Sequence, residues 1–190
     1  MAASAMHLLA AQARFGQQSR RMQIALGELP GDVLHGVLRV LRAHLAVLAQ
    51  EGGGNEALAE AIAADAEVRI RQGYDESATR LGLCARVITG LGGGAMAALE
   101  LPHAGFALFA SALAIATGQS RESCVLATQE GQTARLMLSL RAAGVKDSGV
   151  EAALAALQPR DALPEGFARI TPERAMMILA QRPAATQGRG

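Results

Sequence analysis

The residues best able to bind a metal or move a proton are four histidines and two cysteines. His7, His35 and His103 lie on three separate segments, without a second histidine four residues away. Cys84 and Cys124 are far apart and have mainly apolar neighbours. A zinc site needs three or four converging ligands, so the sequence predicts no metal site. Two buried, reduced thiols are expected, and a disulfide between them stays open.

His44 has a setting in which a histidine could accept a phosphoryl group. Histidine phosphotransfer proteins present one exposed histidine on a helix, and Ala43-His44-Leu45 resembles their local context. The Lys-Gly that normally follows is absent, and Val47 and Leu48 stand there instead. Three leucines define the side of this helix expected to be buried, and His44 lies at its edge, so we expect it to be half-buried. The residues concerned are Leu41, Leu45 and Leu48. A phosphorelay role for His44 is kept as the alternative function.

The segment from Gly90 to Ala95 fits the pattern G-x-G-x-x-A. A dinucleotide site with this pattern needs a strand before it, a helix after it and a second strand that ends in an acid. Residues 86–89 could form a strand, but only a short stretch follows before Pro102, with no second strand. The pattern therefore favours a flexible loop between helices, and no cofactor is predicted.

Other catalytic and nucleic-acid signatures are absent from the sequence. No Ser-His-Asp order, nucleophile elbow or Walker-type phosphate loop occurs, so no catalytic residue is assigned. A single Tyr, no Trp and a net charge of +1 provide neither a stacking platform nor a strong basic field for nucleic acid. His35, Arg39 and Arg42 share one helix face and form at most a small basic patch.

Composition predicts an all-α fold. The chain has 190 residues, of which 51% are hydrophobic, and Ala and Leu dominate while aromatic residues make up 3%. Ala favours helices and disfavours strands. We expect nine or ten helices packed as antiparallel helix pairs, in a helical bundle or a HEAT-like repeat. One domain is expected over residues 1–182, with a flexible tail over 183–190.

Glycine, proline and capping residues predict where the helices begin and end. Asp32 is expected to cap a long helix that runs to about Gln50, Gly52–Gly54 ends it, and Asn55 caps the next. Their inward residues are expected to be Leu34, Val37, Leu38, Leu41, Leu45 and Leu48 in the first helix, and Leu58, Ile62, Ala66 and Val68 in the second. Gly92–Gly94 is a second expected joint.

Further helix boundaries are expected on both sides of this pair. Two short helices precede it, from Ala3 to Ala13 and from Ser19 to Gly27. A central helix from Pro102 to Thr117 is apolar on nearly every face and should be buried. A short helix begins at Ser120, and the last helix begins at Thr171. The longest apolar run has about 14 residues, fewer than the ~20 that span a bilayer, so the sequence predicts a cytoplasmic protein without a membrane partner.

One stretch carries a family resemblance. An apolar helix from Phe106 ends in Thr117-Gly118, a short helix follows around Cys124, and a Leu-rich helix ends in Ala142-Ala143-Gly144. Residues 106–157 resemble the C-terminal part of a family of helical proteins from alphaproteobacteria, related in style to HEAT-type repeats and without an assigned reaction. The resemblance implies an all-α, cytoplasmic, bacterial scaffold and transfers no site residue.

Charge is unevenly distributed along the chain. Arg14, Arg20 and Arg21 lie near the start, whereas residues 51–76 are rich in acids. Opposite charges of this kind either remain solvated or steer docking of a partner or of a second copy. With no catalytic set, the sequence predicts a non-enzymatic protein–protein interaction or regulatory scaffold, whose partner is another protein or the chain itself.

Overall fold

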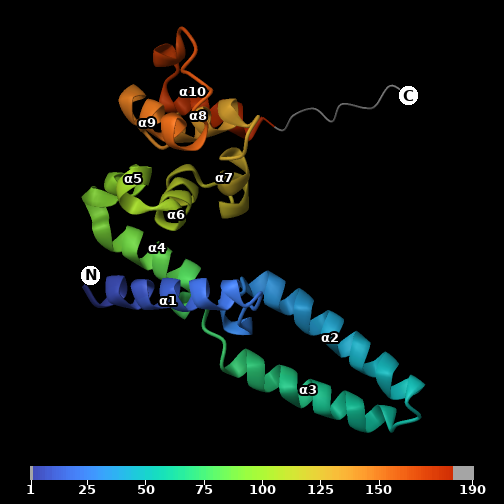
Figure 1. Ribbon diagram of the computed structural model, residues 1–190. Coiled ribbons are helices and arrows are strands. Elements are labelled where there is room, and N and C mark those ends of the chain that lie inside the picture. Colours follow the sequence, from blue (N-terminus) through green and yellow to red (C-terminus); the bar gives the residue numbers. More distant parts are fainter. Residues whose placement is uncertain (1, 182–190) are drawn as a thin grey trace, which may run out of the picture. The chain divides into compact units, whose positions relative to one another are not determined.

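The computed structural model describes residues 2–181, and every regular element in this range is a helix. Figure 1 shows the ten α-helices of the described range, which confirm the predicted all-α class. They are α1 (Ala2–Arg20), α2 (Gly31–Glu51), α3 (Glu56–Gln72), α4 (Arg80–Leu91), α5 (Leu101–Ala104), α6 (Phe106–Thr117), α7 (Arg121–Ala127), α8 (Thr133–Ala142), α9 (Asp147–Leu157) and α10 (Pro172–Ala180). Four 3-10 helices, η1 (Leu26–Glu28), η2 (Glu76–Ala78), η3 (Gly92–Leu99) and η4 (Phe167–Arg169), complete the described set.

The described chain groups into two compact units, which we call the N-terminal unit (Ala2–Leu83) and the C-terminal unit (residues 84–181). Each is described by itself. The single domain expected over 1–182 and the repeat architecture stay predictions. The tail expected over 183–190 lies outside the described residues.

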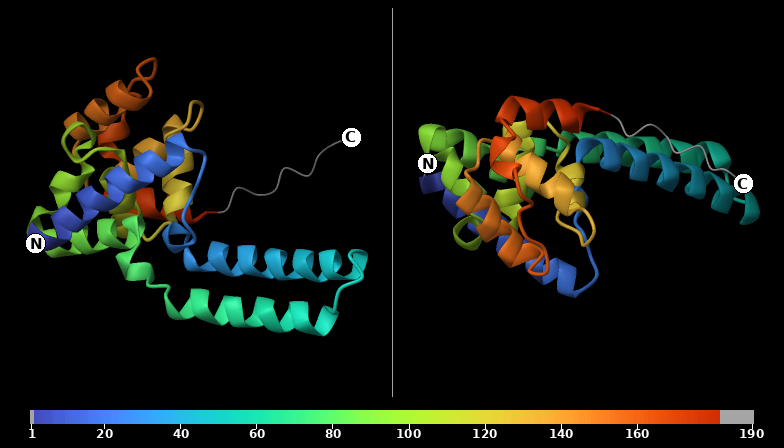
Figure 2. Two further views of the ribbon diagram at one scale, coloured as in Figure 1. Left: turned by 60° about the horizontal axis from the view of Figure 1, so that its bottom comes forward. Right: turned by 90° about the horizontal axis from the view of Figure 1, so that it is seen from above.

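The N-terminal unit contains a helical hairpin formed by α2 and α3. The two helices run antiparallel and side by side in all views (Figures 1 and 2). The predicted boundaries are confirmed, because α2 ends before Gly52 and the Asn55 side chain accepts a hydrogen bond from the Leu58 N–H at 3.2 Å. The expected cap at Asp32 is wrong: Pro30 occupies the N-cap position, and Asp32 lies in the first turn.

The base of the hairpin is fixed by contacts within the same unit. The Tyr74 hydroxyl donates to the Leu29 carbonyl oxygen at 2.8 Å, and the Arg80 backbone N–H donates to the Glu28 carboxylate at 2.8 Å. The Arg80 guanidinium also lies over the Phe15 ring, 4.2 Å from its centroid. These contacts tie α1, the segment before α2 and the start of α4 together.

The start of the chain differs from its prediction. The two short helices expected from Ala3 and from Ser19 are replaced by one helix, α1, which ends at Arg20. Gly16 lies inside this helix, where a glycine costs about 1 kcal/mol relative to Ala but does not break the hydrogen-bonded ladder. Met22, with a φ of 54°, adopts the left-handed conformation that follows a helix end.

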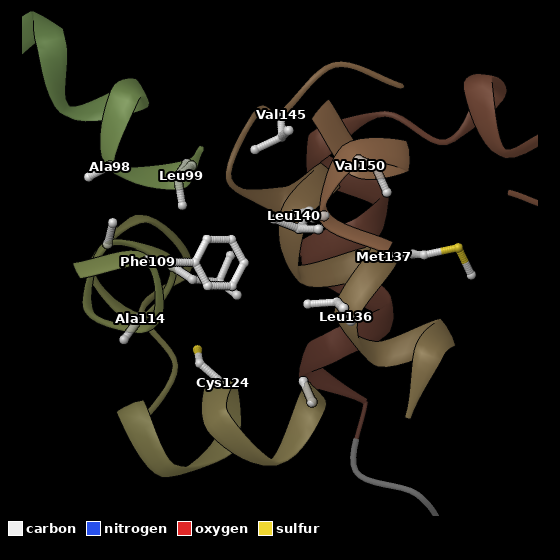
Figure 3. Close-up of a cluster of buried hydrophobic side chains, with 14 of the residues drawn as sticks. Ala98, Leu99, Phe109, Ala114, Cys124, Leu136, Met137, Leu140, Val145 and Val150 are labelled. Carbon is white, nitrogen blue, oxygen red and sulfur yellow. The ribbon is translucent and has the colours of Figure 1, made fainter. Parts of the chain in front are cut away.

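The C-terminal unit is built around a buried apolar cluster, shown in Figure 3. Phe109 and Leu113 of α6 and Leu136 and Leu140 of α8 have no exposed surface. Helices α7, α9 and α10 and the 3-10 helix η3 pack against α6 and α8. Predicted starts are confirmed at two of these elements. The Ser120 hydroxyl caps α7, and Thr171 caps α10.

The central helix of this unit is shorter than predicted. The expected helix from Pro102 to Thr117 is divided into α5 and α6 by Gly105, whose φ of 73° suits glycine and cannot continue a right-handed helix. Burial is also incomplete, because Phe106 and Ile115 are 44% and 49% exposed. The helix does end at Gly118, as predicted.

The second expected joint, Gly92–Gly94, is not a flexible loop. These glycines open the 3-10 helix η3, which directly continues α4. Only Gly92 has a positive φ, of 51°. The prediction read three successive glycines as a loop, whereas burial of Ala98 and Leu99 in the core holds the segment in a helical conformation.

Candidate functional site

Helix α2 is apolar around more than half of its circumference. At 100° per residue, Leu34, Leu38 and Leu45 point along one direction, toward α3. Leu34 and Leu38 are 2% and 3% exposed. The expected inward positions Val37, Leu41 and Leu48 are wrong, because each is at least 40% exposed. A two-helix hairpin offers a single neighbour, and one neighbour covers only part of so wide an arc.

Most of the uncovered apolar side chains of the hairpin form one surface, which we call the open face. Val47, 47% exposed, lies 20° beyond Val40 around α2 and does not belong to it. Its apolar members are between 40% and 70% exposed, and His44 lies among them. It consists of the α2 row, Val33, Val37, Val40, Leu41, His44 and Leu48, and the α3 pair, Leu58 and Ile62. The α3 pair and Val68 were expected to point inward, and this prediction is also wrong. Val68 is 50% exposed, and the buried residue of α3 is Ala63.

Both parts of the open face lie on the same side of the hairpin. Viewed along its axis, α2 carries the α2 row on one side of the direction that faces α3. His35 and Arg42 lie on the other side of that direction. With 100° per residue on α3, Ile62 and Leu58 lie on one side of the buried Ala63. The acids that bind Arg42 lie on the opposite side. Because the helices are antiparallel, the apolar members share one side of the hairpin and the acids that bind Arg42 share the other. The Asp65–Arg69 ion pair of α3 lies beside Ile62 and Leu58 on the apolar side.

The charged side is joined by ion pairs across the two helices. Arg42 contacts the Glu60 carboxylate, with its Nε at 2.9 Å, and the Glu67 carboxylate at 3.4 Å. Arg71 donates to the same Glu67 at 2.8 Å and to His35 Nδ1 at 2.7 Å. We call these five residues the charged row. Two of the three residues of the predicted basic patch are thereby engaged with α3, and Arg42 is neutralised by its carboxylates.

These contacts shift the acidity of the carboxyls. A hydrogen bond from Arg42 lowers the pKa of Glu60 below its ordinary value. A hydrogen bond from Arg71 likewise lowers the pKa of Glu67, with a further contribution from Arg42. Both carboxyls therefore stay ionised, and the charged row holds α2 and α3 in register.

His44 lies on the exposed side of α2. The expectation of half-burial took Leu41 and Leu48 as buried, but both face solvent, and His44 lies between them on the open side. It borders a shallow groove of about 610 Å³ along α2. The other lining residues are Val33, Gly36, Val37, Val40 and Leu41. The surroundings of His44 are therefore apolar.

No other cluster in residues 2–181 assembles a metal or catalytic set. The described residues contain no group of three or more His, Cys, Asp or Glu side chains able to hold a metal ion. His103 and Glu100 do meet, at 3.3 Å between Nδ1 and Oε2. The pair is widely exposed. Cys84 and Cys124 are buried, as predicted.

The glycine pattern from Gly90 to Ala95 lies in a helical setting. Residues 86–89, considered as a strand, belong to α4, and the glycines continue into η3. The strand-turn-helix context that a dinucleotide site requires is therefore absent from this segment.

The C-terminal unit has a cavity of about 520 Å³ where η3 and α5 meet the start of α9. Leu99, Leu101, Val145 and Ala153 supply apolar walls, and Lys146 lies at the border. Small ligands occupy cavities of this size. Glu100, His103 and Ser148 also line this cavity.

One helical stretch among the described residues, Arg80–Leu99, is long and apolar enough to cross a membrane by length and composition. Ile88 and Leu99 of this stretch belong to the buried cluster of the C-terminal unit, and a buried core helix meets the same criterion. The expectation of no membrane partner stays a prediction.

Comparisons of the chain with protein-family models, curated proteins and solved structures found no match.

Proposed function

We propose that this protein acts without catalysing a reaction, by binding a protein chain through the open face of the α2–α3 hairpin. The observation that carries the proposal is a contiguous apolar surface with its apolar members 40–70% exposed, beside a hairpin interface that is already packed. The free surfaces of proteins rarely carry contiguous apolar patches larger than a few hundred Å², and larger ones mark interaction sites.

The chemistry of the open face fits an apolar helical surface as its partner. Successive members of the α2 row are three, four or one residue apart along the helix. Their side chains form ridges with grooves between them. A helix that places its own apolar row into these grooves would bury both surfaces. No buried charge would be created, because the charged row lies on the other side of the hairpin.

Site-specific photo-crosslinking in cells tests the proposal. A photoreactive amino acid at Val40, the most exposed apolar member of α2, should give a covalent adduct of defined mass. The same amino acid at Arg39, which is exposed one step around the helix and outside the open face, is the matched control. Equal crosslinking at both positions, or none at either, would contradict a partner on the open face.

Phosphotransfer through His44 is the second candidate, and its exposure on the middle of a long helix favours it. A receiver domain requires an accessible Nε2, which this placement provides. Incubation with phosphorylated receiver domains, followed by an acid-labile phosphate assay, distinguishes the two functions. Label on the wild type that disappears in His44→Gln would establish phosphotransfer. Absence of label with several receivers is the result we expect.

The wider setting belongs to the same proposal. The resemblance of residues 106–157 to HEAT-like helical proteins of alphaproteobacteria supports a bacterial, cytoplasmic scaffold for the C-terminal unit. The helix pairs of that unit are compatible with such a repeat. In this proposal the hairpin supplies the binding surface, and the pathway is one that the scaffold regulates through its partner.

A further inference from the structure

We infer that the occupant of the open face is the open face of a second copy of this chain, with α2 packed antiparallel against α2 of the partner copy. The inference rests on the proposed function, because it names the partner of the same surface. The resulting assembly is a four-helix arrangement made from two hairpins.

The spacing of the α2 row is the first argument. Between successive members, from Val33 to Leu48, the intervals are 4, 3, 1, 3 and 4 residues. This series, which does not include the neighbouring Val47, reads the same in both directions, with its midpoint between Val40 and Leu41. A two-fold symmetric interface uses one patch twice and therefore requires a self-complementary pattern. The α2 row has that pattern.

The symmetric pairing places an apolar position opposite almost every member of the row. With the axis between Val40 and Leu41, these two residues meet each other's copies across the interface. Val33 lies opposite Leu48 of the partner copy, and Val37 lies opposite its His44. His44 is the only titratable member of the α2 row, and Asp65 and Arg69 beside the α3 pair are bound to each other at 2.9 Å, so no charge has to be buried unpartnered.

The area available is the second argument. The exposed parts of the seven apolar members, each 40–70% exposed, amount to about 650 Å² per copy. A standard stable interface buries roughly 800 Å² per partner. The open face with His44 thus approaches what a specific dimer requires, and exceeds the ~300–600 Å² of the largest patch on a typical monomer.

The charge distribution is the third argument. The charged row and its ion pairs lie on the side of the hairpin away from the open face. Two copies meeting by their apolar sides would keep both charged rows in solvent, so like charges are not brought together. A partner rich in basic or acidic residues would find no complementary charge on the open face itself.

Sedimentation velocity on the full chain tests self-association. We expect a monomer–dimer equilibrium over a concentration series from about 1 to about 200 μM. Val40→Asp, which introduces a charge beside the symmetry axis, should weaken dimerisation at least about tenfold. Val68→Asp is the matched control, because Val68 is an exposed valine of α3 that lies outside the open face. It should dimerise as the wild type does, and far-ultraviolet circular dichroism checks that both variants remain helical.

Cysteine crosslinking tests the antiparallel register. Val40→Cys should form a disulfide between copies under mild oxidation, because position 40 lies beside the axis. Val33→Cys should not crosslink to itself, since its copy lies opposite position 48, about 22 Å further along the helix. A mixture of Val33→Cys and Leu48→Cys should crosslink. Wild-type protein controls for the native thiols of Cys84 and Cys124, which are buried.

The outcomes separate this inference from the proposed function. A wild type that remains monomeric throughout the series would overturn self-association. If Val40 still crosslinks a different protein in cells, the open face binds another partner and the proposed function stands. Equal self-crosslinking at positions 33, 40 and 48 would overturn the antiparallel register, because it requires a parallel dimer.

Discussion

At the scale of single residues, burial decides what each reactive or aromatic side chain does. Cys124 lies in the core of the C-terminal unit with no exposed surface, and burial raises the pKa of its thiol. Phe109 is equally inaccessible, whereas Phe106, three residues earlier on the same helix, is 44% exposed. His44 lies in the opposite environment, because its imidazole is exposed and its neighbours are apolar.

The Cys124 thiol should resist modification in the folded protein. Its raised pKa keeps it protonated at neutral pH, and the thiolate is the reactive form. Ellman's reagent should label it only as fast as the C-terminal unit opens, and promptly in denaturant. Rapid labelling of the native protein would show that the cluster around Cys124 is open.

Phe109→Ala should lower the free energy of unfolding by about 3–5 kcal/mol, because it leaves a cavity in a fully packed cluster. Phe106→Ala is the control on the same helix, and its half-exposed ring should cost much less. Urea unfolding followed by circular dichroism measures both. Similar losses for the two variants would contradict the burial difference.

At the scale of elements, local backbone requirements decide where helices continue. Gly16 lies inside α1, and a Cβ added there would meet no atom within 4 Å. Gly82 lies inside α4, and a Cβ there would lie 2.9 Å from the Ser77 Cα, closer than real contacts allow. Gly16 lowers the stability of its helix, and no close contact requires a glycine there. Gly82, by contrast, allows η2 to pack against α4.

These two glycines predict opposite effects of the same substitution. Gly16→Ala should stabilise the protein by about 0.4–1 kcal/mol, because Ala favours the helix and reduces the freedom of the unfolded chain. Gly82→Ala should destabilise it, because backbone atoms of residues 76 and 77 must move away. Thermal or urea unfolding of both variants measures the difference, and a stabilising Gly82→Ala would contradict the close approach.

The charged row predicts how the hairpin responds to acid. Glu60 and Glu67 have pKa values lowered by Arg42 and Arg71, so they stabilise the folded hairpin above the ordinary carboxyl pKa of about 4.3. This contribution is lost as pH falls through the lowered values. In Arg42→Gln the acid loss of helicity should begin at higher pH. Identical acid titrations of the two proteins, followed by circular dichroism, would contradict the role of Arg42.

At the scale of the whole molecule, part of the acidic run seen in the sequence is neutralised inside the N-terminal unit. Within residues 51–76, Glu60, Asp65 and Glu67 bind arginines of the same hairpin. These pairs reduce the charge that could steer a partner. The apolar open face is therefore the stronger determinant of association, rather than the charge asymmetry.

Association through the open face should be nearly independent of salt. Between roughly 0.05 and 0.5 M salt the Debye length shrinks from well above 10 Å to a few Å, which would weaken a charge-steered dimer strongly. We expect the dissociation constant from sedimentation to change by less than about twofold across that range. A steep loss of the dimer with salt would favour docking of the Arg14–Arg21 region on the acidic run.

The sequence by itself determined the helical class and most helix ends, because these depend on local chemistry. Ala-rich composition, the Asn55, Ser120 and Thr171 caps and the left-handed glycine at Gly118 act within a few residues. Only the tertiary structure decided which apolar side of α2 is buried. Its apolar arc is wide enough for two neighbours, and the side that α3 covers depends on the small residues of α3 and on the ion pairs of Arg42. Because the sequence pattern does not say which side α3 covers, it could not predict the open face or the exposure of His44.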